Sequence, residues 1–82
     1  MKILVVEDDL NLSNMLVKLL QDFGFVCDVV YDGDAAYERG CTEFYDAAIL
    51  DLGLPQRDGI SVLQGWRDFG CAMPVLILTA RG

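Results

Sequence analysis

Acidic residues stand directly after two apolar segments of this chain, and their types and spacing suit metal-dependent chemistry. Residues 3–6 are all aliphatic and lead into the acids at residues 7–9. Residues 47–50 form a second apolar run, which ends in Asp51. Carboxylates brought together are costly unless a cation lies among them, because burial and like charge both disfavour the ionised form. The two runs therefore indicate a divalent metal site and chemistry on an aspartate.

The hydrophobic pattern predicts short strands that alternate with helices. We expect strands at residues 2–6, 25–31, 46–51 and 75–79, and helices at residues 10–23, at residues 32–42 and from Asp58-Gly59 onward. These strands lack the alternation of a half-exposed sheet, which favours a parallel sheet with helices on both faces. Because crossovers between parallel strands are right-handed, the predicted fold class is α/β with a doubly wound parallel sheet of about four strands.

The helical segments also predict part of the core. Apolar residues recur at helical spacing in residues 10–23, and we expect this stripe to be buried. Its members are Leu10, Leu12, Met15, Leu16, Leu19, Leu20 and Phe23. In the third helix we expect Trp66 in the core, with Ile60, Leu63 and Phe69 on the same apolar side.

The acids allow two interpretations. In doubly wound sheets, ligands bind beyond the carboxyl ends of the strands, which is where Glu7, Asp8 and Asp51 are expected. An acid just before an apolar helix also commonly caps that helix, and Asp9 is the better candidate for this role. Asp51 taken alone is a credible turn residue, although it is less so opposite Glu7 and Asp8.

Composition excludes several functions. With 82 residues the chain is at most one small domain, and its formal net charge of −7 argues against direct contact with nucleic acid. Its three cysteines form no C-x-x-C pair and are accompanied by no histidine, so a zinc site is not indicated. No apolar stretch approaches the roughly 20 residues of a membrane span, and the first residues lack a signal-peptide pattern. We therefore expect a cytoplasmic protein.

Several motifs in order resemble one known family. Residues 3–9, residues 49–55 with Asp58-Gly59, and residues 78–80 together resemble the receiver domain of bacterial two-component response regulators. The D-L-G-L-P segment is most similar to the branch whose members carry a winged-helix DNA-binding domain after the receiver. Each motif alone is weak, but the ordered set covers the whole chain and is specific.

The resemblance implies a role for each site residue. Asp51 would be the phosphoacceptor, which takes a phosphoryl group from a sensor histidine kinase without being an enzyme in the usual sense. Asp8 would bind Mg²⁺ directly and Glu7 through water, and Asp51 and the carbonyl of Gly53 would supply further ligands. Thr79 would contact the phosphoryl group and act as a switch. Without the resemblance, Thr79 is an ordinary strand-end threonine and Gly53 serves only turn geometry.

The resemblance also predicts what the chain lacks. A receiver continues past the fourth strand, and its later lysine and output surface have no counterpart in residues 1–82, so we expect an N-terminal portion of a receiver domain with impaired activity. In the family's strand order the fourth strand is interior, but here it would be an edge. Residues 75–79 carry no charge, and we therefore expect a homodimer that pairs this strand between two chains, or a swapped arrangement that buries the same surface.

The residues also allow three alternative functions to be considered. In the first, the chain is a half-domain that assembles through its fourth strand without being phosphorylated. A phosphatase of the haloacid dehalogenase type would also use a strand-end aspartate, but it needs a second acid two residues later, where this chain has Gly53. A dinucleotide-binding function is disfavoured because no G-x-G-x-x-G follows the first strand.

Overall fold

Strands and helices alternate along the chain, as the hydrophobic pattern predicts. The computed structural model describes residues 1–78. The strands are β1 (Lys2–Val6), β2 (Val26–Val30), β3 (Ala47–Asp51) and β4 (Val75–Leu78). The helices are α1 (Leu10–Asp22), α2 (Gly33–Thr42) and α3 (Gly59–Phe69). The predicted elements are confirmed, and no boundary within the described residues differs from its predicted position by more than one residue.

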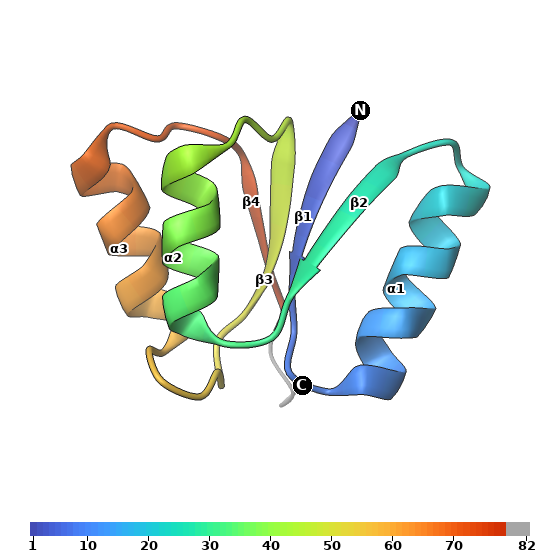
Figure 1. Cartoon of the computed structure of the whole chain (residues 1–82), viewed down its shortest axis with the longest axis horizontal. Coiled ribbons are helices and arrows are strands. Elements are labelled where there is room, and N and C mark those ends of the chain that lie inside the picture. Colours follow the sequence, from blue (N-terminus) through green and yellow to red (C-terminus); the bar gives the residue numbers. More distant parts are fainter. Residues whose placement is uncertain (79–82) are drawn as a thin grey trace.

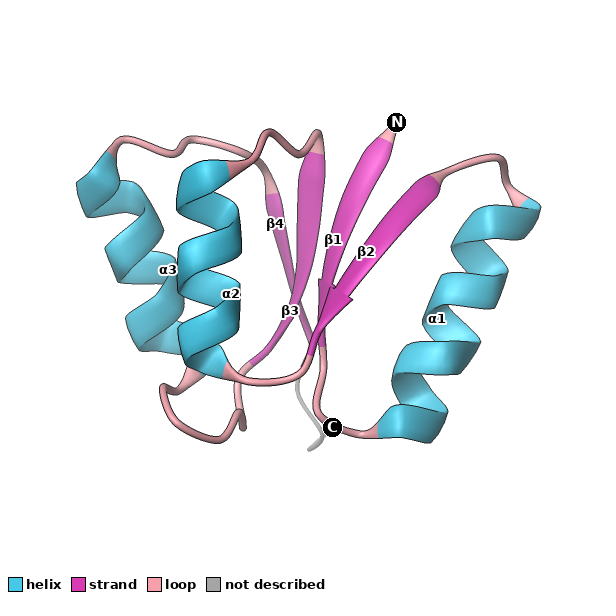
Figure 2. Cartoon of the chain, in the orientation of Figure 1, coloured by secondary structure: helices cyan, strands magenta, loops and turns pink. Residues whose placement is uncertain are grey.

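One parallel sheet contains these four strands, in the order β2-β1-β3-β4. Val5 lies opposite Val29 on one side and Ile49 on the other, so β1 is interior and is paired along its length. In Figure 1, α1 lies on one face of the sheet, and α2 and α3 lie side by side on the other. The predicted doubly wound α/β fold is therefore confirmed, and Figure 2 shows the strands enclosed between the two helical layers.

The main core lies between the sheet and the layer formed by α2 and α3. Leu4 and Leu50 from the sheet and Val62 from α3 are fully buried there. Trp66 is also fully buried, and its Nε1–H donates to the carbonyl oxygens of Ala36 at 3.1 Å and Tyr37 at 3.3 Å. The predicted core position of Trp66 is thus confirmed, and its indole links α3 to α2.

Aspartates begin all three helices. The side chain of Asp9 accepts the N–H of Leu12 at 3.1 Å, and Asp32 accepts the N–H of Ala35 at 2.8 Å. Asp58 caps α3 in the same way. These side chains satisfy backbone donors that have no partner within the helix, so Asp9 is the helix cap, as expected.

The apolar stripe of α1 is less buried than predicted. Leu10, Met15, Leu19 and Phe23 are 60%, 61%, 52% and 73% exposed, and Ser13 is the buried residue of this helix. The reason is tertiary: α1 packs mainly on β2 and β1, and no other helix in residues 1–78 lies on that face (Figure 1). The prediction that the whole stripe belongs to the core was therefore wrong.

The apolar side of α3 also differs from the prediction. Val62 and Trp66 are buried, and Leu63 packs partly against the same core. Ile60 and Phe69 are instead 48% and 62% exposed. Helical spacing placed them on the apolar side, but a large part of each side chain faces solvent.

β4 forms an edge of the described sheet, with β3 as its partner. Leu76 is 61% exposed and Ile77 is 41% exposed.

Among the helices of residues 1–78, none is long and apolar enough to cross a membrane.

Tyr45 belongs to a cluster of polar side chains near the amino ends of β1 and β3. Its ring is buried, and its hydroxyl donates to Oδ2 of Asp28 at 2.7 Å. Arg39 and Lys2 pair with the same carboxylate at 3.6 Å and 3.8 Å. Burial, opposed by the nearby Arg39 and reinforced by Asp28, raises the pKa of Tyr45 from 10.0 to about 12.

We predict that Tyr45→Phe lowers the free energy of unfolding at neutral pH by about 1.5 kcal/mol, because a hydrogen bond to a charged group is lost. The raised pKa adds a pH dependence. The unfolded chain releases the tyrosine proton before the folded chain does, so this stabilisation is complete below pH 10 and is lost as the pH rises toward 12. Urea unfolding should therefore show a smaller difference in the free energy of unfolding between wild type and Tyr45→Phe at pH 11 than at pH 9. Tyr31→Phe, at an exposed tyrosine, is the control, and a constant gap would contradict the prediction.

Candidate functional site

Three carboxylates meet at the carboxyl edge of the sheet. β1 and β3 are adjacent and parallel, with Val6 opposite Leu50, so the residues that follow each of them are neighbours. Carboxylate oxygens of Glu7, Asp8 and Asp51 all lie within 4.8 Å of one another. The strand pairing therefore brings together acids that are far apart in the sequence.

Two members of this acid cluster are shielded from water. Glu7 is 4% exposed and Asp51 is 8% exposed, whereas Asp8 is open to solvent. Burial raises the pKa of Glu7, and the charge of Asp51 adds to the effect; the backbone N–H of Asp9, which donates to Oε2 of Glu7 at 3.0 Å, opposes it. The cluster thus carries negative charge in a partly desolvated place.

The acid cluster lacks a basic partner in the part of the chain that the structure describes. The ion pairs formed within residues 1–78 use Lys2, Arg39 and Arg57, and none of them includes a member of the cluster. Hard oxygen ligands with one solvent-exposed side are what Mg²⁺ prefers, because it keeps several of its waters. The donor set and its uncompensated charge therefore fit a divalent cation.

The loop from Leu52 to Asp58 joins β3 to α3 and holds Asp51 in place. The N–H of Gly59, the first residue of α3, donates to the carbonyl of Leu52 at 3.0 Å. A Cβ on Gly59 would overlap with the carbonyl of Asp51 and with Leu52, so the helix starts directly against the end of the strand. Gly53, by contrast, is exposed and has open space around it.

The structure brings together three of the five predicted site residues, namely Glu7, Asp8 and Asp51. Gly53 lies in the adjoining loop, and the role of its carbonyl stays a prediction. Thr79 lies outside the described residues. Sequence reasoning missed Arg57, which connects this loop to α2 through Asp34. Its only signal in the sequence was a basic residue in the loop after β3.

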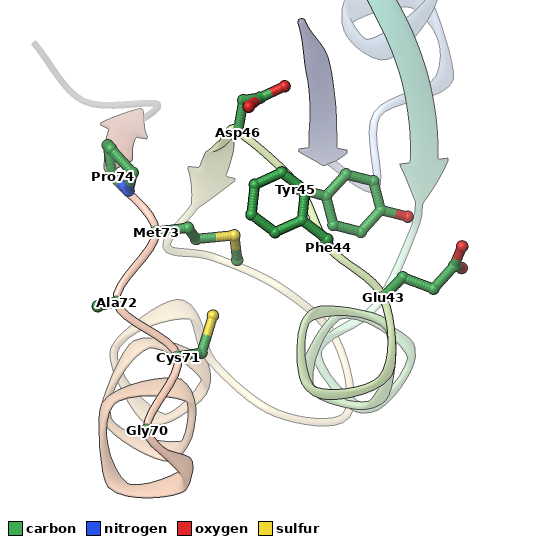
Figure 3. Close-up of a pocket in the computed structure, with 9 residues that line it drawn as sticks. All are labelled: Glu43, Phe44, Tyr45, Asp46, Gly70, Cys71, Ala72, Met73 and Pro74. Carbon is green, nitrogen blue, oxygen red and sulfur yellow. The ribbon is translucent and has the colours of Figure 1, made fainter.

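A cavity of about 430 Å³ opens at the opposite edge of the sheet, between the loops that precede β3 and β4 (Figure 3). Phe44, Tyr45, Cys71 and Met73 are among the residues that line it. Its acids are already engaged: Glu43 pairs with Lys2 and Arg39, and Asp46 accepts the backbone N–H of Lys2 at 2.7 Å. This cavity is chemically unlike the acid cluster.

Comparison with protein families agrees with the fold. The model of the response regulator receiver domain matches residues 3–82. The chain belongs to the response regulator receiver domain family, which confirms the resemblance read from its motifs.

Curated relatives are transcriptional regulators by name. The transcriptional regulatory protein DltR of Streptococcus agalactiae is 41% identical over 81 residues, which are 99% of this chain and 36% of DltR. CiaR of Streptococcus pneumoniae is 45% identical over 80 residues, which are 98% of this chain and 35% of CiaR. The chain thus spans about a third of the length of each of these two relatives.

Solved receiver domains share the fold. The receiver domain of the Francisella response regulator 1452 has a TM-score of 0.93 and 32% identity, and the match covers 98% of this chain and 66% of that one. The receiver domain of the histidine kinase PA1611 from Pseudomonas aeruginosa, solved with magnesium in its active-site cleft, has a TM-score of 0.93 and 32% identity, over 98% of this chain and 67% of that one. TrrA of Thermotoga maritima, solved in complex with Mg²⁺-BeF, has a TM-score of 0.92 and 31% identity, over 99% of this chain and 70% of that one.

We predict that Asp51→Asn raises the free energy of unfolding in the absence of divalent cations. Like charges within 4.8 Å repel, and removing one of them should stabilise the fold by about 1 kcal/mol. Mg²⁺ should stabilise the wild type and should stabilise Asp51→Asn less. Thermal unfolding with and without Mg²⁺ measures both effects.

Glu38→Gln removes an equal charge from an exposed site on α2 and serves as the control. It should leave the Mg²⁺ effect intact. An Asp51→Asn variant that gains no stability and responds to Mg²⁺ like the wild type would contradict the prediction.

Proposed function

We propose that this chain is the phosphoacceptor module of a two-component response regulator that acts in the cytoplasm. In this proposal Asp51 receives a phosphoryl group from a sensor histidine kinase in a Mg²⁺-dependent reaction. The observation that carries the proposal is the convergence of Glu7, Asp8 and Asp51 at one strand edge, without a basic partner in residues 1–78.

The residues of the chain suit each part of this reaction. A carboxylate oxygen of Asp51 attacks phosphorus as the bond to the kinase histidine breaks, which gives an acyl phosphate on Asp51. Glu7, Asp8 and Asp51 would hold the cation, with Gly53 contributing its carbonyl. Mg²⁺ bound there supplies charge neutralisation for the phosphoryl oxygens, because phosphoryl transfer depends mainly on positioning and electrostatics. Thr79 is proposed to contact the modified site.

The consequence of phosphorylation is proposed from the relatives. DltR and CiaR are named transcriptional regulatory proteins, and this chain matches about a third of each. We propose that phosphorylation regulates transcription through a DNA-binding domain of the winged-helix type, and that residues 1–82 do not themselves contact nucleic acid. The module is a phosphoacceptor and not an enzyme with an external substrate.

We predict that a small phosphodonor such as acetyl phosphate adds one phosphoryl group to the chain when Mg²⁺ is present. Intact mass spectrometry detects the product, and treatment with hydroxylamine should remove an acyl phosphate. Asp51→Asn should abolish labelling, and Asp8→Asn should reduce it strongly because the cation site is lost.

Asp9→Asn is the matched control. It removes a neighbouring acid, but asparagine caps helices as well as aspartate does, so labelling should persist. Labelling that survives Asp51→Asn would place the phosphate on another residue and would overturn the proposed function.

The exposed edge at β4 supports a second proposal, which concerns the assembly of the chain. β4 offers unpaired backbone groups along its outer side in the described sheet, and Leu76 and Ile77 are exposed beside them. Its four residues are all aliphatic, so the charges that usually protect an edge are missing. We propose that the 82-residue chain forms a homodimer through antiparallel pairing of β4 across a two-fold axis.

We predict that light scattering coupled to size exclusion finds a dimer of this 82-residue chain, and that Leu76→Lys converts it to a monomer. Val26→Lys is the matched control, because Val26 is 60% exposed and lies in β2, the strand at the opposite edge of the sheet. This control should stay dimeric. A wild-type chain that is monomeric at high concentration would rule out the pairing, with no bearing on phosphorylation of Asp51.

A further inference from the structure

The loop between β3 and α3 is attached to the start of α2. The N–H of Gly33 donates to the carbonyl of Pro55 at 3.0 Å. Nε of Arg57 lies 3.5 Å from Oδ1 of Asp34, and its guanidinium lies 4.5 Å from the ring centroid of Tyr37. Three contacts of different kinds therefore join one short loop to the first turns of one helix.

The fit between the loop and α2 leaves no room for a side chain at Gly33. A Cβ at this position would overlap with the carbonyl of Arg57. Gly33 is buried, whereas Arg57 remains partly exposed, with 37% of its side chain accessible. The backbone of the loop thus rests directly on the backbone of α2, and the side chain of Arg57 closes over the contact.

The same loop contains a strained residue. Gln56 has a φ of 71°, in the left-handed region that residues with a side chain rarely adopt. It is the centre of a tight turn in which the N–H of Arg57 donates to the carbonyl of Pro55 at 2.8 Å. Such a conformation persists only where surrounding contacts hold it. Pro55 and Arg57, the residues on either side of Gln56, both make contacts to α2.

We propose that Arg57 is a positioning residue for the cation site. By binding Asp34 and Tyr37 of α2, it keeps the strained loop in the conformation that presents Gly53 beside Asp51, and it thereby sets the affinity of the acid cluster for Mg²⁺. This inference rests on the proposed function, since it takes the cation to bind at Glu7, Asp8 and Asp51.

The sign of the effect separates positioning from simple electrostatics. Arg57 is a positive charge, so its removal by charge alone would make the acid cluster more attractive to Mg²⁺. Loss of positioning acts in the opposite direction, because ligands that must be ordered on binding give a weaker site. A weaker site in Arg57→Ala therefore indicates positioning.

The test is Mg²⁺ titration of the ¹⁵N-labelled 82-residue chain, followed through the amide resonances of Asp8 and Gly53. We expect Arg57→Ala to raise the dissociation constant about fivefold, the scale of one exposed ion pair plus one cation–π contact. Arg57→Lys, which keeps the charge and both partners within reach, should recover most of the affinity. Arg67→Ala, which removes an equal charge from α3, should not weaken binding.

A second pair of variants tests the contact from the side of α2. Asp34→Asn removes the partner of Arg57, while Glu38→Gln removes an equal charge one turn further along the same exposed surface. Asp34→Asn should weaken Mg²⁺ binding more than Glu38→Gln does. Both sites are exposed, so both variants are expected to fold.

The backbone strain at Gln56 allows a test in which lost Mg²⁺ affinity is recovered. Glycine adopts the left-handed conformation freely, so Gln56→Gly added to Arg57→Ala should recover part of the lost affinity. Arg57→Ala that binds Mg²⁺ as tightly as the wild type, or more tightly, overturns the inference but leaves the proposed function standing. A wild-type chain that binds no Mg²⁺ overturns both.

Discussion

The parallel pairing of β1 with β3 is the constraint on which the rest of the molecule depends. It places the residues after Val6 next to those after Leu50, and so gathers at one edge acids that the chain separates widely. The pairing is maintained although it forces Glu7 and Asp51 together in a partly desolvated place, because burial of the aliphatic residues of both strands outweighs this repulsion. The stability of the core thus sustains a cluster of charge that would otherwise disperse.

Around that edge, the backbones of neighbouring elements pack directly against one another. α3 begins against the end of β3 at Gly59, and α2 begins against the following loop at Gly33. Both contacts are possible only because these residues lack a Cβ, so the two helices enclose the loop that follows Asp51 from different sides. The molecule therefore has a rigid support on one side of the acid cluster, while Asp8 on the other side remains open to solvent.

Sequence reasoning succeeded where the determining interactions are local. Strands follow from aliphatic runs, and Asp9 and Asp32 are recognisable caps because a side chain and the amide it binds are three residues apart. It failed where burial depends on distant neighbours: helical spacing cannot tell that Met15 and Phe23 face away from the described core. The acid cluster was predictable because parallel strands share a carboxyl edge. The role of Arg57 was not, since its contact with Asp34 depends on how a loop rests on a helix.

The buried indole of Trp66 has a practical consequence. It is the only tryptophan of the chain, and it belongs to α3 while both of its hydrogen-bond acceptors belong to α2. Its emission spectrum therefore depends on whether these two helices stay in register, whereas α1 lies on the other face of the sheet. The fluorescence of Trp66 can therefore report on the packing of α3 against α2 without an added label.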